Sequence, residues 1–370
     1  MQEKQGSSGD NRPVVVVTGA AGEVGRSVAA ALKERYRVVG LDVPGACSDL
    51  SLIPIDLTAD ISVTRALDQL RDTCGAHLAG VVHLAEHRDL GGADDPRYRT
   101  LNVDGTRRLL DRLQRFRVDR FVLASTMFVE RPGSPGAAID EDRPLGPHGA
   151  YSTSKAAAEQ TVRERHRAIL YAILRVAWLY DDETVPPPLA HRIAHIRERT
   201  LASHLHAGDP AVRQAALHRD DLADAIVKLV DRRAALPDDL VLLLGEPDPP
   251  SVADLQDAIG EALHGQQWRT LRVPAPAVTA AEWIENNVRS HLAKALGDVE
   301  RPPPLRTTGV ADDDYALDFG RAATLLDWTP RRRLKATLPT ALRSLKRDPQ
   351  AWYAANGLPW PGAGDTPAGT

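Results

Sequence analysis

The chain has few of the residues that support cross-linked, metal-bound or membrane-embedded folds. Cys47 and Cys74 are its only cysteines, too few and too isolated for a disulfide framework or a cysteine-ligated metal site. No apolar run approaches the roughly 18 residues of a membrane-spanning helix. The polar start MQEKQGSSGDNRP lacks the apolar centre of a signal peptide. We therefore expect a cytoplasmic protein with no membrane partner.

The charges are balanced and the apolar content is ordinary. Lysine and arginine total 46 against 50 aspartate and glutamate residues, which gives a formal net charge of −4. Such a surface has no overall attraction to nucleic acid, so we expect small-molecule partners. An apolar fraction of 43% is enough for a sizeable core in a chain of 370 residues.

The histidines do not form a recognisable metal motif. His191 and His195 are four residues apart, with His204 and His206 nearby, but no glutamate of a zinc motif accompanies them. A solvated helix face explains this spacing better, and we expect no bound metal. The basic run at 331–333 is likewise interpreted as solvent-exposed.

A β-branched run, a glycine-rich turn and a helical pattern open the ordered part of the chain. Val14 to Thr18 predicts a strand, and apolar residues then recur at helical spacing from Val24 to Leu32. Between them lie Gly19, Gly22 and Gly25. Glycines here let the backbone approach a pyrophosphate, whose charge is met by the amides of the helix N-terminus.

A second strand, predicted over residues 36–42, ends in Asp42, seventeen residues after Gly25. A carboxylate at this position can bind the two ribose hydroxyls of NAD. Residues 43–45 are Val, Pro and Gly, so no basic residue follows at once to hold the 2′-phosphate of NADP. The alternative is an ordinary turn residue at a strand end.

Strand and helix patterns alternate along the first half of the chain. Further strands are predicted at 53–57, 78–85, 120–126 and 171–180, and helices at 62–70, at 102–116 and from Tyr151 onward. This alternation predicts an α/β fold with a doubly wound parallel sheet of the Rossmann type. Ligands of such sheets bind at the carboxyl ends of the strands, where Asp42, Asp56, Ala85 and Thr126 would lie.

Prolines at 186–188 and 302–304 interrupt the regular pattern and indicate a second, smaller C-terminal domain that binds substrate. The predicted organisation is a disordered tail at 1–12, an NAD-binding domain at 13–180 to which the chain returns at about 213–246, a substrate-binding domain at 181–212 and 247–345, and a C-terminal tail at 346–370. Ser251 and Asp254 form a helix-capping pattern. Trp352, Tyr353 and Trp360 either pack back on the fold or serve a partner.

The segment AYSTSKAAAEQ carries the main catalytic candidate. Tyr151 and Lys155 are four residues apart at the start of a predicted helix, which places both side chains on one face. A phenol becomes a base near neutral pH when a nearby ammonium favours its phenolate. Tyr151 is the candidate base and Lys155 its activator, although a Tyr-x-x-x-Lys pair also arises by chance on many helices.

Taken in order, these motifs resemble the extended short-chain dehydrogenase/reductases, the NAD-dependent epimerase/dehydratase family, over roughly residues 13–330. The segments that carry the resemblance are TGAAGEVG at 18–25, LD at 41–42, IDL at 55–57, HLA at 83–85, NVDGT at 102–106, AST at 124–126, the Tyr-x-x-x-Lys pair, HRDDLADA at 218–225 and LLDWTP at 325–330. The twenty-five residues from Thr126 to Tyr151 match the spacing of the family.

The resemblance implies NAD as cofactor and a catalytic triad of Thr126, Tyr151 and Lys155. In it, Tyr151 takes the proton of a substrate hydroxyl, Thr126 bonds the same oxygen, and Lys155 also holds the nicotinamide ribose. The implied cofactor-binding residues are Gly19, Gly22, Glu23, Val24, Gly25, Asp42, Asp56, Leu57, Leu84, Ala85, Asn102, Tyr151 and Lys155. Ser125, Thr126, Tyr151 and Arg213 are the implied substrate-binding residues. A homodimer through the helices at 102–116 and 151–167 is expected by analogy.

Departures from the family pattern concern the substrate. Met127 and Phe128 replace the Asp-Glu pair of the dehydratases, which disfavours elimination of water. Trp178 stands where sugar epimerases often carry an asparagine for the nucleotide diphosphate. Arg213 lies one position from the usual phosphate-binding arginine, and a solvated surface role is its alternative.

Three functions remain to be distinguished. The leading hypothesis is an NAD-dependent sugar epimerase or a related oxidoreductase that oxidises a secondary hydroxyl. The second is a net dehydrogenase or ketoreductase acting on a non-sugar alcohol. The third, a catalytically silent NAD-binding regulator, needs the glycine turn but not the triad, so the intact Thr126, Tyr151 and Lys155 count against it.

Overall fold

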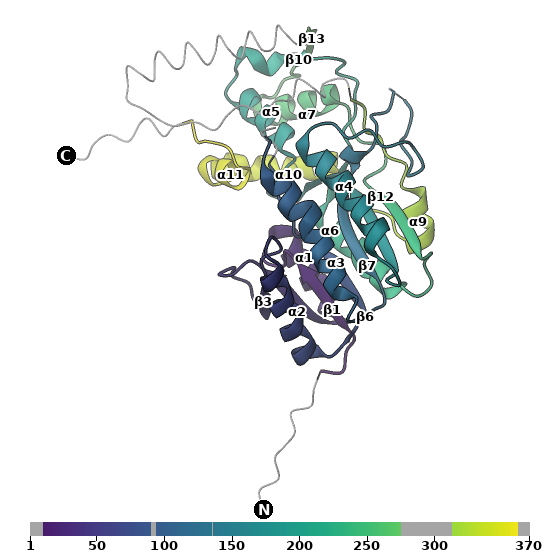
Figure 1. The fold of residues 1–370 in the computed structure, drawn as a ribbon. Helices are drawn as coiled ribbons and strands as arrows, with labels where there is room; N and C mark the ends of the chain where they lie inside the picture. Colours follow the sequence, from purple (N-terminus) through teal and green to yellow (C-terminus); the bar gives the residue numbers. More distant parts are fainter. Residues whose placement is uncertain (1–9, 90–93, 135, 275–312, 362–370) are drawn as a thin grey trace, which may run out of the picture.

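The computed structural model describes residues 10–89, 94–134, 136–274 and 313–361. Its centre is a seven-stranded sheet with the order β12-β8-β7-β5-β1-β2-β3, in which every neighbouring pair is parallel (Figure 1). The strands are β1 Val14–Thr18, β2 Arg37–Asp42, β3 Leu52–Pro54, β5 Gly80–His83, β7 Phe121–Thr126, β8 Tyr171–Val176 and β12 Asp239–Leu244. The predicted doubly wound sheet is therefore confirmed.

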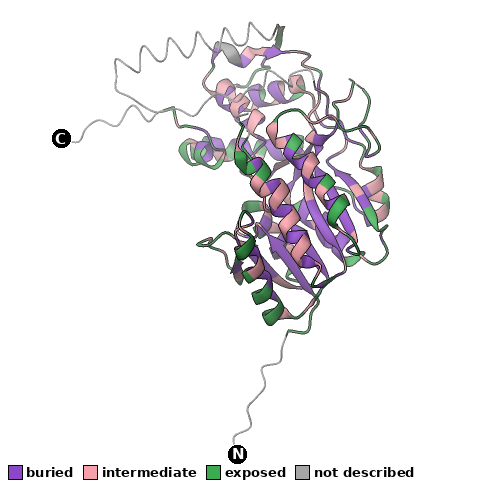
Figure 2. Cartoon of the chain, in the orientation of Figure 1, coloured by how far each residue is buried: buried purple, intermediate pink, exposed green. Residues whose placement is uncertain are grey.

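Helices cover both faces of the sheet, which is why its strands are mostly apolar. One hydrophobic cluster joins the sheet to α2 Asp60–Cys74, α3 Asp104–Leu113 and α4 Ala150–Arg165. The other joins it to α1 Glu23–Leu32, α6 Arg219–Asp231 and α9 Gly320–Leu326. Figure 2 shows the resulting pattern, with buried strands between helices that are exposed along their outer faces. Burial on both faces is typical of parallel sheets.

Several elements differ from their predicted bounds. The strand predicted at 53–57 ends at Pro54, and the one predicted at 78–85 is split into β4 His77–Leu78, which pairs with β6 Arg117–Val118, and β5. A π-helical turn, Tyr98–Val103, precedes α3 and takes up the start of the helix predicted at 102–116.

The strand predicted at 171–180 changes partner in its middle. Ala177 still donates a backbone hydrogen bond to Leu244, but Trp178 donates to Ala215 instead. Residues Trp178–Tyr180 therefore form β9, which leaves the main sheet and pairs with β11 Ala216–His218. Apolar patterning cannot locate this switch, because both partners are buried.

A smaller C-terminal domain packs around a third hydrophobic cluster. Its helices are α5 Pro187–Arg197, α7 Val252–His264, α10 Leu334–Arg347 and α11 Pro349–Ala355, and β10 Leu205–Ala207 pairs with β13 Leu271–Val273. The predicted cap of α7 is confirmed, since the Ser251 hydroxyl accepts from Asp254 N and the Asp254 carboxylate accepts from Ser251 N. No helix in the described part of the chain is long and apolar enough to cross a bilayer.

The predicted tails have different outcomes. Residues 1–9 and 362–370 lie outside the described residues, as does 275–312 of the predicted substrate-binding domain. Within the predicted C-terminal tail, α11 is a helix whose Trp352 and Tyr353 are buried in the third cluster. The aromatic residues there pack back on the fold, so residues 346–361 are not a detached tail. Apolar burial of two aromatic side chains is the physical reason.

Candidate active site

The turn between β1 and α1 is built for close backbone approach. Gly19 has a φ of +68°, and a Cβ placed there would lie 2.9 Å from Ala85 N. A Cβ on Gly25 would lie 2.0 Å from the carbonyl oxygen of Gly19. Gly22 is the N-cap of α1 and has no side chain to cap the helix, which leaves the first-turn amides to another acceptor. A helix start of this kind fits the pyrophosphate of a dinucleotide.

Asp42 lies at the carboxyl end of β2, beside this turn. Its carboxylate accepts hydrogen bonds from Ala21 N and Val43 N, both at 2.7 Å. A carboxylate has about four acceptor positions, so two remain for the hydroxyls of a ribose. The donors of the turn and this carboxylate together fit NAD.

Glu23, another of the predicted cofactor residues, directly follows the glycine turn as the first residue of α1. Its carboxylate pairs with Arg219 of α6 at 3.1 Å, and the same guanidinium contacts Asp181 at 2.8 Å. The Glu23 carboxylate is therefore paired with a cation of α6. Val24, the next predicted residue, lies half-buried against the first cluster.

The loop after β3 carries Asp56 and Leu57. Asp56 accepts from the amide and the hydroxyl of Thr58, and its own amide donates to Ser62 Oγ. Leu57 is buried in the second hydrophobic cluster. Both residues therefore shape the loop.

A buried polar network fixes the end of β5, where Leu84 and Ala85 follow the strand. The hydroxyl of Thr18 accepts from the amides of both residues at 3.2 Å and bonds His83 Nδ1 at 2.7 Å. His83 Nε2 lies 3.0 Å from Thr106 Oγ1. Burial lowers the pKa of His83 to about 3, followed by the charge of Lys155. The ring is therefore neutral, and it positions the backbone beside the cofactor site.

Asn102 performs a related positioning role. Its carbonyl oxygen accepts from His87 N at 2.7 Å, and its amide nitrogen donates to His87 O and Ser154 Oγ, both at 3.0 Å. The side chain is buried, and both of its donor hydrogens have protein partners. Asn102 therefore links the segment after β5 to α4. The sequence predicted a contact with NAD for this residue and gave no sign of these internal bonds.

Thr126, Tyr151 and Lys155 converge at one edge of the sheet. Thr126 ends β7, and Tyr151 and Lys155 lie one helical turn apart at the start of α4. Lys155 Nζ donates to Ala124 O at 2.6 Å. Thr126 Oγ1 accepts from Phe128 N at 3.4 Å, and the Thr126 hydroxyl acts to lower the pKa of the Tyr151 phenol. The predicted triad is therefore brought together.

A carboxylate that sequence reasoning missed lies between the two residues on α4. Glu86 Oε2 accepts from Tyr151 Oη at 3.1 Å and pairs with Lys155 Nζ at 2.8 Å. Burial and the charge of Glu86 raise the pKa of Tyr151 well above its usual value, whereas Arg88 and the bond with Thr126 act in the opposite direction. Glu86 thus pairs with the Lys155 ammonium and sets its own negative charge beside the phenol.

The side chains of Ser125 and Arg213 each bond a buried carboxylate. The Ser125 hydroxyl donates to Glu159 at 2.6 Å, within a buried network where Arg175 also bonds Glu159. Successive residues of a strand face opposite sides of the sheet, so Ser125 points away from the face of Thr126. Arg213 pairs at 2.7 Å with the fully buried Asp314. Its guanidinium therefore has a partner inside the protein, while the side chain remains 28% exposed.

Two aromatic side chains pack against Phe128, which lies two residues after the end of β7. The centroid of the Phe128 ring lies 4.9 Å from that of Trp178 and 5.2 Å from that of Tyr315, and both pairs pack edge to face. Phe128 and Trp178 are half-buried. We call these three residues the aromatic patch: Tyr315 is buried beneath it, and the partly exposed rings of Phe128 and Trp178 form its apolar surface near Thr126.

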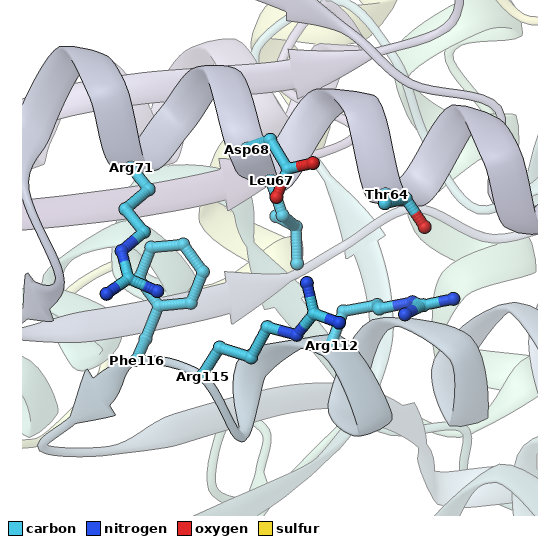
Figure 3. Close-up of a pocket in the computed structure, with 7 residues that line it drawn as sticks. All are labelled: Thr64, Leu67, Asp68, Arg71, Arg112, Arg115 and Phe116. Atoms are coloured by element: carbon cyan, nitrogen blue, oxygen red, sulfur yellow. The ribbon is translucent and has the colours of Figure 1, made fainter.

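A pocket away from the triad does not offer a second site. Arg71, Arg112 and Arg115 line it with Phe116 between α2 and α3 (Figure 3). Its cavity volume of about 10 Å³ is space for roughly one water molecule. The three guanidinium groups therefore lie at a dent in the surface.

With this geometry established, comparison with known proteins identifies the family. The family model of the NAD dependent epimerase/dehydratase family matches residues 15–245, more than half of the chain. The chain belongs to this family. The resemblance read from the motifs is confirmed, and with it the assignment to a family of NAD-dependent enzymes.

Relatives within the family differ in the reactions that their names describe. The chain is 26% identical to dTDP-D-glucose 4,6-dehydratase from Mus musculus, over 62% of this chain and 68% of that protein. It is 29% identical to 4-hydroxy-2-methyl-3-oxo-4-farnesyl-3,4-dihydroquinoline-1-oxide ketoreductase from Stigmatella aurantiaca, over 86% of this chain and 90% of that protein.

Among solved structures, the fold is similar to UDP-glucuronic acid 4-epimerase from Bacillus cereus in complex with UDP-glucuronic acid and NAD. The TM-score is 0.63 at 20% identity, covering 90% of this chain and 99% of that one. At this identity the likeness shows the fold of the two chains.

Proposed function

We propose that the protein is an NAD-dependent epimerase-type oxidoreductase that oxidises a secondary hydroxyl, with a nucleotide sugar as the first candidate substrate. The observation that carries this proposal is the convergence of Thr126, Tyr151 and Lys155 at the carboxyl edge of the sheet. The same edge of the sheet carries the glycine turn, which follows β1, and Asp42, which ends β2. Relatives and fold neighbours named for nucleotide-sugar reactions support the substrate class.

Each residue of the triad has a distinct task. Tyr151 exchanges a proton with the substrate oxygen, and Thr126 donates a hydrogen bond to that oxygen and so fixes its distance from the phenol. Lys155 holds its ammonium next to the phenol and is available to a ribose hydroxyl. The bound cofactor supplies the hydride acceptor.

Asp42 determines which dinucleotide binds. Its remaining acceptor positions suit the two hydroxyls of an adenosine ribose, whereas a 2′-phosphate would bring like charges together. The residues after Asp42 are Val43, Pro44 and Gly45, none of which offers a compensating charge. NAD is therefore preferred over NADP.

The aromatic patch favours a second candidate function. The partly exposed rings of Phe128 and Trp178 offer apolar contacts and few hydrogen-bond partners to a diphosphate. A ring-containing alcohol or ketone fits such a surface, and the similarity to a ketoreductase extends over most of both chains. In this case the reaction is a net oxidation or reduction.

One experiment separates the two functions. The purified protein is denatured and the released small molecule is identified by mass and absorbance. Tightly held NAD or NADH supports the epimerase, which recycles its cofactor, and nucleotide sugars are then screened for epimerisation. An empty protein that binds NAD reversibly supports the dehydrogenase, and alcohols are screened for accumulating NADH. A protein that neither contains nor binds NAD contradicts both.

The assembly is part of the proposal. The helices α3 and α4 pack side by side on one face of the sheet (Figure 1), and their outer faces are where we place a homodimer interface. Light scattering tests it directly. A mass of twice the 40.2 kDa of the chain supports the dimer, and a monomer contradicts it.

A further inference from the structure

Glu86 is the one acidic side chain in direct contact with both α4 residues of the triad, within the described part of the chain. It follows β5 by three residues, and its side chain is 25% exposed, against 4% for Lys155. A single carboxylate oxygen, Oε2, bonds Tyr151 Oη at 3.1 Å and Lys155 Nζ at 2.8 Å. The function proposed above gives this residue no task.

The geometry restricts where the phenolic proton can go. A phenol has one hydrogen, and a carboxylate paired with an ammonium acts as an acceptor, so Tyr151 donates its hydrogen to Glu86. A tyrosine that takes a proton from a substrate hydroxyl must lose its own. The group already bonded to that hydrogen is the nearest acceptor, and its exposure connects it to solvent.

We propose that Glu86 is the proton-exchange partner of Tyr151, so that a proton leaves the substrate hydroxyl for Tyr151 as the phenolic proton passes to the Glu86 carboxylate. This inference rests on the proposed function. The substrate O–H bond breaks as a new phenolic O–H bond forms, and the former phenolic O–H bond breaks as the carboxyl O–H bond forms. The hydride of the same carbon goes to NAD⁺, which is reduced, and the alcohol becomes a ketone. Reduction of a ketone runs through the same bonds in reverse.

The neighbouring side chains keep Glu86 in this position. Lys155 Nζ is also held by Ala124 O, so the ammonium cannot follow Glu86 away from the site. Next to Glu86, His87 has its backbone amide and carbonyl fixed by Asn102. The ionisable and charged groups around the pair are Lys155 on α4, Arg88 and His87 on the same segment, Asp95 opposite His87, and Tyr98, whose ring lies 6.5 Å from that of Tyr151.

The first test measures the phenol itself and needs no substrate. Tyrosinate absorbance is recorded after rapid mixing to a series of alkaline pH values, for wild type and for Glu86→Gln. Each is compared with the same protein carrying Tyr151→Phe. The difference isolates Tyr151 from the other tyrosines. Removing the adjacent negative charge should raise the acid dissociation constant of Tyr151 at least about tenfold. Unchanged ionisation would mean that Glu86 does not hold this proton and would overturn the inference.

The second test measures proton transfer. With a substrate from the screen above, single-turnover formation of NADH should fall about 100-fold in Glu86→Gln, because glutamine keeps the shape and hydrogen bond but cannot take a proton. Formate, which supplies a carboxylate, should restore part of the rate to Glu86→Ala, whereas the shape-conserving Glu86→Gln separates proton transfer from positioning. Glu164→Gln is the matched control, since it removes one charge from the exposed side of α4, and it should leave the rate unchanged.

The outcomes separate this inference from the function on which it rests. A wild-type protein that binds NAD but turns over no nucleotide sugar, alcohol or ketone contradicts the proposed function, while the phenol titration still decides whether Glu86 holds the tyrosine proton. An active enzyme whose Glu86→Gln variant keeps the wild-type rate overturns the role of Glu86 alone.

Discussion

Replacing Gly25 by alanine tests the glycine turn, because packing and helix propensity predict opposite signs. Gly25 lies in the first turn of α1, where alanine alone would favour the helix by up to about 1 kcal/mol. A Cβ at this position, however, would lie 2.0 Å from Gly19 O and 2.7 Å from Ala20 Cα. Carbon contacts are favourable at roughly 3.5–4.0 Å, so α1 and the turn would have to separate by more than 1 Å.

Both neighbours of this Cβ are backbone atoms, which cannot rotate away as a flexible side chain can. Overpacking of this kind costs typically 1–3 kcal/mol, and we expect Gly25→Ala to lower the free energy of unfolding by about 2–3 kcal/mol. NAD affinity should fall together with it, because the first-turn amides move with α1. Urea unfolding and titration calorimetry with NAD measure the two effects.

The matched control is Gly80→Ala, at a buried glycine of β5. The nearest atom to a Cβ there is Arg120 O at 3.7 Å, an ordinary contact distance. This variant should unfold within about 1 kcal/mol of wild type. If Gly25→Ala is as stable as wild type, or more stable, and keeps its NAD affinity, then the close approach of α1 to the turn is not what the site requires.

Three further predictions concern the cofactor, a buried carboxyl and the C-terminal helix. Asp42→Ala should weaken NAD binding roughly 10- to 100-fold through lost hydrogen bonds to a charged group, and unchanged affinity in calorimetry would remove Asp42 from the site. Burial raises the pKa of Glu246 from 4.5 to about 7. The stability that its protonated form contributes is therefore present below pH 4.5 and is lost as the pH rises through 7, by roughly 3 kcal/mol at most. In urea unfolding from pH 5 to 8, the free energy of unfolding should fall less for Glu246→Gln than for wild type, and equal falls would refute this. Trp352→Ala should destabilise the fold by about 3–5 kcal/mol because the indole is buried in the third cluster, whereas a neutral result in thermal unfolding would mean that α11 contributes nothing to packing.

The sequence predicted the sheet well because its strands are buried on both faces. Val14–Thr18 is β-branched throughout, and Phe121–Thr126 departs from an apolar or β-branched run only at Ser125. The ends of these strands carry residues that the proposed site uses. The glycine turn and the Tyr-x-x-x-Lys spacing are local, since each depends on residues a few positions apart. Local patterns of this kind survive into the folded chain.

What the sequence could not predict depends on contacts between distant segments. Glu86 meets Tyr151 across 65 positions, and one glutamate after a strand has no periodicity to mark it. The only available signal was a charged residue directly after the HLA segment, at the carboxyl edge where ligands bind. Asn102 likewise finds His87 and Ser154 only once the fold is formed, and the Ser125 hydroxyl finds Glu159.

The most direct test of the account is the Tyr151→Phe variant, assayed for turnover and for NAD affinity in the same preparation. Removing only the phenolic oxygen should reduce turnover at least about 100-fold while NAD binds within about twofold of wild type, because the glycine turn and Asp42 are untouched. Retained turnover would show that Tyr151 does not exchange the substrate proton. Equal loss of turnover and NAD affinity would assign the residue to the structure of the site and contradict the proposed chemistry.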